Sequence, residues 1–131
     1  LGETQQLPQL LAAADFVVLS LPDNPETHHM IDAAALAQMK PGAFLINLGR
    51  GGLIDKAAFI AALRSGALGG AGLDVFWQEP PDPQDEVFRY NVIATPHIGG
   101  VTDRSLAGNV AGVCDNLRRL RDNETIENRW A

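Results

Sequence analysis

The 131-residue sequence predicts an α/β fold, with a parallel, doubly wound sheet of about four strands. Two observations indicate this class. Short apolar runs alternate with helix-like segments along the chain, and turn residues separate one from the next. The apolar runs are nearly continuous instead of alternating with polar residues, which is typical of strands covered on both faces. We therefore expect flanking helices on the sheet and a long helix at the C-terminal end.

Each element has its own local signal. Asp32 and Asp55 stand where an N-cap would begin a helix. Pro41-Gly42 and Gly66 end the two helices that follow them. The last two strands are joined by a Pro- and Asp-rich loop. In chain order the expected elements are helix 7–14, strand 16–21 closed by Pro22, helix 33–39, strand 43–48, helix 56–65, strand 70–76, strand 91–95 and helix 102–122.

The last of these helices carries an apolar stripe. Gly108 and Gly112, four residues apart, are poor helix formers that would allow another backbone to approach closely. The helix therefore needs a surface to pack on, either within the domain or on another chain. The stripe follows a 4-3-4-3 spacing and consists of Leu106, Val110, Val113, Leu117 and Leu120.

Composition narrows the classes of function. The net charge is −6, and the one dense basic cluster, Arg118, Arg119 and Arg121, falls at a helix C-terminus, where cations offset the macrodipole. We therefore expect no nucleic-acid and no membrane-surface partner. Cys114 is the single cysteine, so we expect no intramolecular disulfide and no Cys-based metal site. No signal peptide or membrane-spanning run is present, which predicts a cytoplasmic location, and the missing initiator Met suggests a fragment or a processed chain.

A glycine-rich loop follows the second apolar run. It holds an arginine, in the pattern N-x-x-R-G-x-x-x-D made by Asn47, Arg50 and Asp55. Gly49, Gly51 and Gly52 would let the backbone approach a ligand with no Cβ in the way. The guanidinium of Arg50 can bind a carboxylate with two parallel hydrogen bonds. From the loop alone, a surface arginine paired with a nearby acid is an equal alternative.

Two acids follow the third apolar run. Asp74 closes the predicted strand, and Glu79 lies on a loop stiffened by Pro80, Pro81 and Pro83. Read singly, both acids could be solvated turn residues. The preceding stretch "GGAG" is not a phosphate loop, because it leads into a strand instead of opening a helix.

A histidine follows the fourth apolar run. His97 lies between a Pro and two glycines, at the sheet edge where Arg50 and Glu79 are also expected. His28 and His29 are expected to be surface residues, in a polar turn at the opposite end of a helical segment. Together, the arginine could hold a carboxylate, the histidine could move a proton, and the glutamate could orient the imidazole and favour its charged form. This set suits oxidation of a hydroxyl beside a carboxylate, with hydride passing to a cofactor.

Four stretches in register carry a resemblance to a known family. They are "ADFVVLSLPDNPET", "MKPGAFLINLGRGGLID", "AALRSGALGGAGLDVFWQEP" and "NVIATPHIGG". Residues 7–122 resemble the second half of the nucleotide-binding domain of the D-isomer-specific 2-hydroxyacid dehydrogenases, which implies a partial Rossmann-like sheet. The implied cofactor is NAD or NADP, and the implied substrate is a small 2-hydroxyacid or 2-ketoacid.

The resemblance also implies roles for individual residues. Arg50 would bind the substrate carboxylate and carbonyl, His97 would be the general acid and base, and Glu79 would pair with His97. Formate dehydrogenases, which are related, carry Gln where this chain has Glu79, so a hydroxyacid is favoured over formate. Corepressors that share the fold keep similar residues, so the motifs alone do not prove turnover. The residues implied to line the cofactor are Leu21, Leu48, Gly49, Arg50, Asp74, His97, Gly99 and Gly100.

The chain departs from the family pattern in what it lacks. No G-x-G-x-x-G that follows a strand and opens a helix is present, and no substrate domain is recognised. Dinucleotide binding by this chain alone is therefore expected to be weak or absent. Strand 16–21 would lose its usual neighbour and become an exposed edge. We therefore expect homo-oligomers, formed through this strand or through helix 102–122.

Three hypotheses remain open from the sequence. Residues 1–131 could be the second half of the dinucleotide-binding domain of an NAD(P)-dependent hydroxyacid dehydrogenase, inactive because it is truncated. They could instead form a stand-alone, non-enzymatic binding or assembly module derived from the family. They could also be part of a longer enzyme. The sequence identifies neither the hydroxyacid nor the choice between NAD and NADP.

Overall fold

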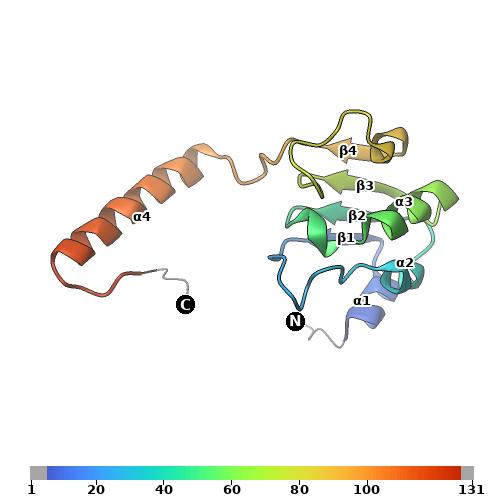
Figure 1. Cartoon of the computed structure of the whole chain (residues 1–131). Helices are drawn as coiled ribbons and strands as arrows, with labels where there is room; N and C mark the ends of the chain where they lie inside the picture. Colours follow the sequence, from blue (N-terminus) through green and yellow to red (C-terminus); the bar gives the residue numbers. More distant parts are fainter. Residues whose placement is uncertain (1–5, 128–131) are drawn as a thin grey trace. The chain divides into compact units, whose positions relative to one another are not determined.

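The computed structural model describes residues 6–127, which form two compact units, residues 6–97 and residues 98–127. The first unit is a four-stranded, all-parallel sheet in the order β1-β2-β3-β4, with helices beside it (Figure 1). This confirms the predicted fold class. Its elements are α1 (Leu7–Ala13), β1 (Phe16–Leu19), α2 (Ala33–Gln38), β2 (Ala43–Asn47), η2 (Gly51–Leu53), α3 (Lys56–Ser65), β3 (Leu68–Leu73), η3 (Glu86–Arg89) and β4 (Val92–Ala94).

The predicted helix caps are present. The Asp32 carboxylate accepts a hydrogen bond from the Ala35 N–H at 2.8 Å, and Asp55 caps α3 in the same way. Gly66 ends α3 with φ 75°, a left-handed conformation that glycine adopts without steric cost. These polar groups satisfy backbone donors that a helix end leaves unpaired, so the sequence places the helix boundaries well.

Two strands, β1 and β3, differ from the prediction by more than one residue at an end. β1 ends at Leu19, so Leu21 lies beyond it, and β3 spans Leu68–Leu73 instead of residues 70–76. The length of β3 follows its neighbour, because Ala43 pairs with Leu68 and Asn47 pairs with Leu73 at the two ends of β2. A strand extends only as far as its partner supplies hydrogen-bonding groups, which the apolar pattern of one strand does not reveal.

Helices cover one face of the sheet, and the other face is open within the first unit. Two right-handed crossovers in the same direction place α2 and α3 on one face, where they contact each other. Phe16, Val18 and Ile93 are 66%, 57% and 76% exposed on the other face. The expectation that strand 16–21 is covered on both faces is therefore wrong for this unit. The core residues that are completely buried are Ile31, Leu45, Leu53, Ile54, Phe59 and Val87.

The second unit is dominated by α4 (Asp103–Arg121). Its N-cap Thr102 and its third residue Ser105 form a reciprocal capping box, and three arginines lie in its last turn. The five residues of the predicted stripe are each between 58% and 70% exposed, so the stripe is open within the described part of the second unit. Within the described range, none of the helices combines the length and hydrophobicity needed to span a bilayer.

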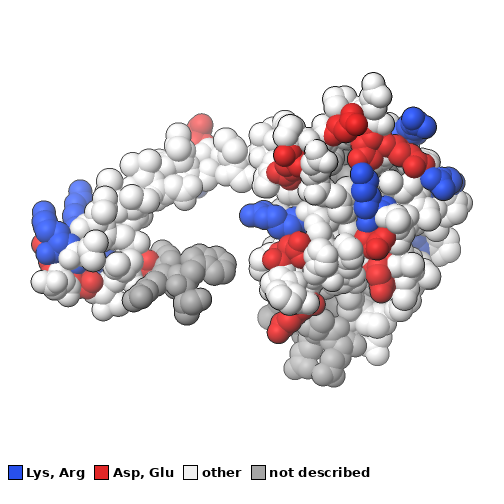
Figure 2. All heavy atoms as spheres, in the orientation of Figure 1, with Lys and Arg blue, Asp and Glu red and all other residues white. Residues whose placement is uncertain are grey.

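Charges of both signs are mixed over the visible face of the first unit (Figure 2). One pair, Lys56 on α3 and Asp85 before η3, joins two elements that are distant in sequence. Burial alone would raise the pKa of Asp85, but hydrogen bonds from Lys56 and from the Val87 N–H outweigh it and hold the pKa below its ordinary value. The carboxylate is therefore ionised at neutral pH and fastens the β3–β4 connection to α3.

Replacing Asp85 with asparagine is expected to lower the free energy of unfolding at pH 7 by about 1 kcal/mol, the contribution of a charge-assisted hydrogen bond. Because the pKa of Asp85 is lower in the folded chain than its ordinary value of 3.8, the ionised carboxylate stabilises the fold at pH values above 3.8. This stabilisation is lost as the pH falls through the pKa of the folded chain. Urea unfolding from pH 7 to pH 3 should therefore show the two proteins converging in acid. Asp15→Asn, which removes an exposed pair with Lys40, is the control with little expected effect. A difference that is the same at every pH would contradict this assignment.

Candidate functional site

Three polar segments meet at one edge of the sheet. Because all four strands are parallel, their carboxyl ends lie at the same edge. The glycine-rich loop follows β2, the segment from Asp74 to Glu79 follows β3, and Thr95 to His97 follow β4. The two buried polar side chains of the described range, Asn47 and Asp74, both lie at this edge. Buried polar groups are rare and need partners, so this edge is the chemically distinctive part of the first unit.

His97 and Glu79 form a hydrogen-bonded pair. The imidazole Nδ1 lies 2.7 Å from one carboxylate oxygen of Glu79, and the other oxygen accepts the Phe76 N–H at 3.0 Å. The hydrogen bond with His97, then that from Phe76, and more weakly the charge of Arg50, lower the pKa of Glu79. An ionised carboxylate only accepts, so Nδ1–H is the donor. The other ring nitrogen, Nε2, is then the one that can exchange a proton with a ligand.

Arg50 lies on the same side as this pair. Its guanidinium is exposed and donates from Nη1 to the carbonyl of Gly49 at 2.7 Å. The loop that carries Arg50 packs on the segment that carries Glu79, because a Cβ on Gly51 would lie 2.2 Å from the carbonyl oxygen of Phe76. The structure therefore brings the three predicted residues to one edge, with His97 and Glu79 in direct contact and Arg50 beside them.

Asn47 fixes the shape of the loop that carries Arg50. Its side-chain amide donates to the carbonyl of Arg50 at 2.8 Å, and its side-chain oxygen accepts the Gly49 N–H at 3.0 Å. The side chain is 1% exposed, so the two bonds are shielded from water. The sequence placed Asn47 in a motif with Arg50 but did not predict this bracing role.

The loop glycines approach the chain's own backbone. A Cβ on Gly49 would lie 2.5 Å from the carbonyl oxygen of Leu21, and one on Gly51 would lie 2.2 Å from that of Phe76. Neighbouring loops fill the space where the side chains of Gly49 and Gly51 would be, which the sequence did not predict, and the approach of these glycines to a ligand stays a prediction. The glycines let the loops after β1, β2 and β3 pack against one another.

Asp74 is linked to the end of β4. The Thr95 hydroxyl donates to the Asp74 carboxylate at 2.5 Å, and the Thr95 N–H donates to the carbonyl of Leu73 at 2.9 Å. The sequence identified Asp74 but missed Thr95. A hydroxyl residue directly after a strand, beside an acid that closes the neighbouring strand, was the available signal.

The turn that contains His28 and His29 is also at this edge, contrary to the prediction. The His29 N–H donates to the carbonyl of Gly52 at 2.8 Å, and His28 pairs with Asp23 at 3.1 Å. The prediction failed because the turn precedes α2, and the N-terminus of a crossover helix lies at the carboxyl end of the strand before it. Both imidazoles are about half exposed, as expected for surface residues.

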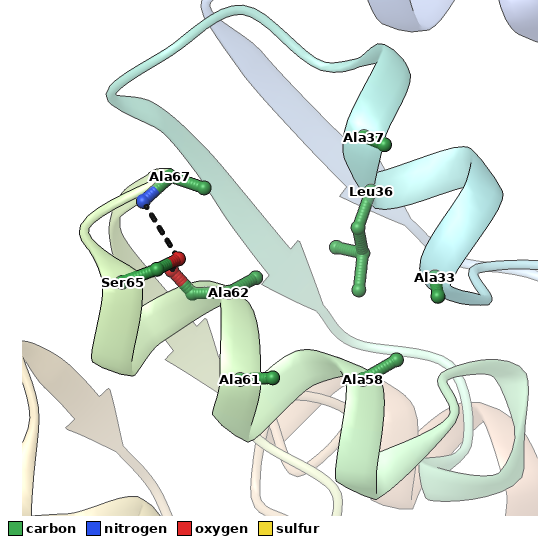
Figure 3. A pocket seen from close by; sticks show the side chains of 8 residues that line it. All are labelled: Ala33, Leu36, Ala37, Ala58, Ala61, Ala62, Ser65 and Ala67. Atoms are coloured by element: carbon green, nitrogen blue, oxygen red, sulfur yellow. Dashed lines mark hydrogen bonds between the residues drawn. The ribbon is translucent and has the colours of Figure 1, made fainter.

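Two hollows differ sharply in chemistry. A small one of about 90 Å³ lies beside the hydrogen-bonded His97 and Glu79. It is lined by Phe76, Glu79, Pro80, Pro81, Pro96 and His97. A larger groove of about 360 Å³ lies between α2 and α3 (Figure 3). Its lining is alanine apart from Leu36 and Ser65, and the Ser65 hydroxyl already bonds to backbone atoms of Ala62 and Ala67. The groove has no titratable side chain, so the candidate site is the polar edge.

Four further residues were predicted to line the cofactor, and they lie in different parts of the structure. Leu21 is half-buried against Gly49, and Leu48 is 51% exposed beside Arg50. Gly99 and Gly100 belong to the second unit, so their approach to a nicotinamide stays a prediction. Within residues 6–127, no cluster of three or more His, Cys, Asp or Glu side chains could hold a metal ion.

Comparison with known proteins places the chain in a family. The model described as D-isomer specific 2-hydroxyacid dehydrogenase, NAD binding domain, matches residues 2–99, which is three quarters of the chain. The chain belongs to this family. Glyoxylate/hydroxypyruvate reductase B from Erwinia tasmaniensis is 48% identical over 117 residues, which cover 88% of this chain and 36% of that protein. The same enzyme from Citrobacter koseri is 50% identical over 112 residues, covering 85% and 35%.

Solved structures of the family support the fold. A D-isomer specific 2-hydroxyacid dehydrogenase from Xanthobacter autotrophicus, in complex with NADPH and MES, gives a TM-score of 0.86 at 38% identity. The match covers 97% of this chain and 52% of that chain. D-mandelate dehydrogenase from Rhodotorula graminis gives 0.81 at 40% identity, with coverage of 86% and 33%. The chain therefore spans little more than a third of the length of its curated dehydrogenase relatives.

Proposed function

We propose that residues 1–131 are the second half of the dinucleotide-binding domain of an NAD(P)-dependent D-2-hydroxyacid dehydrogenase. Such an enzyme transfers hydride between a 2-hydroxyacid and nicotinamide. The observation that carries the proposal is the 2.7 Å pair of His97 and Glu79, with Arg50 on the loop that packs beside the Glu79 segment. A proton-transfer group oriented by a carboxylate and accompanied by an anion-binding group is what hydroxyacid chemistry requires.

The three side chains divide the chemistry. Arg50 binds the substrate carboxylate through its planar guanidinium, which matches the two carboxylate oxygens. In the reducing direction His97 Nε2 donates a proton to the carbonyl oxygen at C2, and in the oxidising direction it removes the hydroxyl proton. Glu79 holds the ring through Nδ1 and stabilises the positive charge that the imidazole carries when it is protonated.

The nicotinamide end of a cofactor fits this edge better than the phosphate end. Bound nicotinamide would supply or accept the hydride. The exposed Leu48, with Leu21 beside Gly49, offers an apolar surface for the ring, and Asp74, Gly99 and Gly100 are the proposed polar and backbone neighbours. The chain has no glycine-rich loop that follows a strand and opens a helix, so the pyrophosphate lacks its usual site.

The substrate class is a small 2-ketoacid or 2-hydroxyacid. Arg50 selects for a carboxylate, and the relatives at 48% and 50% identity are named for glyoxylate and hydroxypyruvate, both of which are 2-ketoacids. We propose the same class for this chain as part of a complete enzyme. The cytoplasmic location and the absence of nucleic-acid and membrane partners stay predictions.

A chimera tests the proposed chemistry. The matching segment of the Erwinia tasmaniensis reductase is replaced by this chain, and NADH or NADPH oxidation is followed with glyoxylate and hydroxypyruvate. We expect turnover by the folded chimera, whereas the chain alone should be inactive and should bind NADH weakly in calorimetric titration. A folded chimera without turnover would contradict the proposal. Micromolar NADH binding by the chain alone would show that the account of the phosphate site is wrong.

Self-association is the second part of the proposal. The exposed apolar surfaces of β1 and α4 would also suit a non-enzymatic assembly module. We expect the chain to form dimers or larger oligomers, because Phe16 and Val18 on edge strand β1 are exposed. Phe16→Lys should shift light scattering toward the monomer if β1 is the interface, and Leu117→Lys should do so if the α4 stripe is. A monomeric wild-type chain at high concentration would exclude both surfaces.

A further inference from the structure

Thr95 bonds through three different groups to residues at the carboxyl edge of the sheet. Its hydroxyl donates to the Asp74 carboxylate at 2.5 Å, and its N–H donates to the carbonyl of Leu73 at 2.9 Å. Its carbonyl accepts the N–H of His97 at 3.0 Å, which closes a tight turn over Pro96. Thr95 therefore connects the end of β3 to the residue proposed to move the proton.

The backbone of His97 needs such a restraint. Its φ is 54°, in the left-handed region that a residue with a side chain adopts only when its surroundings hold it there. The turn from Thr95 to His97 follows β4, a strand of only three residues at the edge of the sheet. Few ladder hydrogen bonds are available there, so the side-chain bond to Asp74 adds to the two backbone bonds that hold the turn.

Asp74 is a firm anchor for that bond. Its side chain is 3% exposed, and its N–H donates to the carbonyl of Asn47 at 3.0 Å, which ties it to β2. A hydroxyl that donates to a carboxylate at 2.5 Å is a short, charge-assisted contact. Because the sheet holds Asp74 in place, the Thr95 hydroxyl that bonds to Asp74 is held in place as well.

We propose that Thr95 is a positioning residue: by anchoring its hydroxyl on Asp74, it holds the Thr95–Pro96–His97 turn so that His97 Nδ1 meets Glu79. Without the hydroxyl, the backbone of His97 relaxes out of the left-handed region and the imidazole loses its alignment with the carboxylate. The catalytic consequence rests on the proposed function. The positioning itself is a property of this chain and can be measured without turnover.

The test compares Thr95→Val, which removes the hydroxyl at nearly constant size, with Thr95→Ser, which keeps it. Thr27→Val is the control, because Thr27 also donates its hydroxyl within a turn but has no link to Asp74. Carbon-13 NMR of the Glu79 carboxyl gives its pKa, and the amide-to-α-proton coupling of His97 reports φ. Should Thr95→Val not fold, Thr95→Cys, whose thiol is a weak donor, gives the same comparison.

We expect the pKa of Glu79 to rise toward its ordinary value of 4.5 in Thr95→Val, since the hydrogen bond from His97 is the largest cause of its depression. The His97 coupling should change in the same variant. Thr95→Ser and Thr27→Val should match the wild-type chain in both measurements. An unchanged pKa and coupling in Thr95→Val would overturn the proposal. An inactive chimera alongside these expected shifts would refute the proposed function and leave the positioning role intact.

Discussion

Replacing Gly51 with alanine is expected to destabilise the first unit by roughly 3 kcal/mol, at the upper end of the usual cost of overpacking. The new Cβ would lie 2.2 Å from the carbonyl oxygen of Phe76 and 2.5 Å from the N of Trp77. Both are backbone atoms, so no side chain can rotate away. The loop after β2 would have to separate from the segment after β3, and this would also displace Arg50 and Glu79. Urea unfolding of wild-type and variant chains measures the difference.

Gly108→Ala is the matched control. A Cβ at Gly108 meets no atom within 4 Å, and the residue lies inside α4, where alanine favours the helix by about 1 kcal/mol over glycine. Circular dichroism should therefore show equal or higher helix content in that variant. Equal stability of Gly51→Ala and the wild-type chain would mean that the two loops are not packed as the structure has them.

The sequence predicts elements better than it predicts the contacts between loops. Asp32, Asp55 and Gly66 were readable because caps are local, and a few residues contain all the information. Arg50, Glu79 and His97 were readable as one group because parallel strands bring their carboxyl ends together. The extent of β3 was not readable, because it is set by pairing with β2.

Contacts between segments explain the remaining misses. The sequence suggested that Gly51 lets a ligand approach, but it did not show that Gly51 packs on the backbone of Phe76, twenty-five positions away. Thr95 looked like the last residue of a strand, and its role depends on Asp74, which lies on a different strand end. The turn of His28 and His29 was misplaced because the crossover to α2 brings it to the carboxyl end of the sheet, where the His29 N–H bonds to the carbonyl of Gly52. The hydrophobic periodicity of one segment does not show which residues of another segment it contacts.

His97→Gln in the chimera is expected to lower kcat/KM roughly 10²- to 10⁴-fold, the usual contribution of a general acid or base. Glutamine is similar in size and can still donate to Glu79, but it cannot exchange a proton at neutral pH. The loss should appear in steady-state rates of NADH oxidation with glyoxylate. Lys40→Gln is the control, because Lys40 pairs with Asp15 at the amino end of β2, away from the site. Activity of His97→Gln equal to that of the parent chimera would exclude His97 as the proton-transfer group.

Combining His97→Gln with Glu79→Gln in one chimera shows whether Glu79 acts through His97 or directly on the substrate or cofactor. The structure shows Glu79 bonded to Nδ1 of His97 and to the Phe76 N–H, so we expect it to act through the imidazole. Glu79→Gln alone should reduce kcat/KM less than His97→Gln, because glutamine still accepts from Nδ1 but carries no charge. In the double variant the second substitution should then add little, since the group on which it acts is gone. Fully additive losses would instead mean that Glu79 contacts the substrate or cofactor independently of His97.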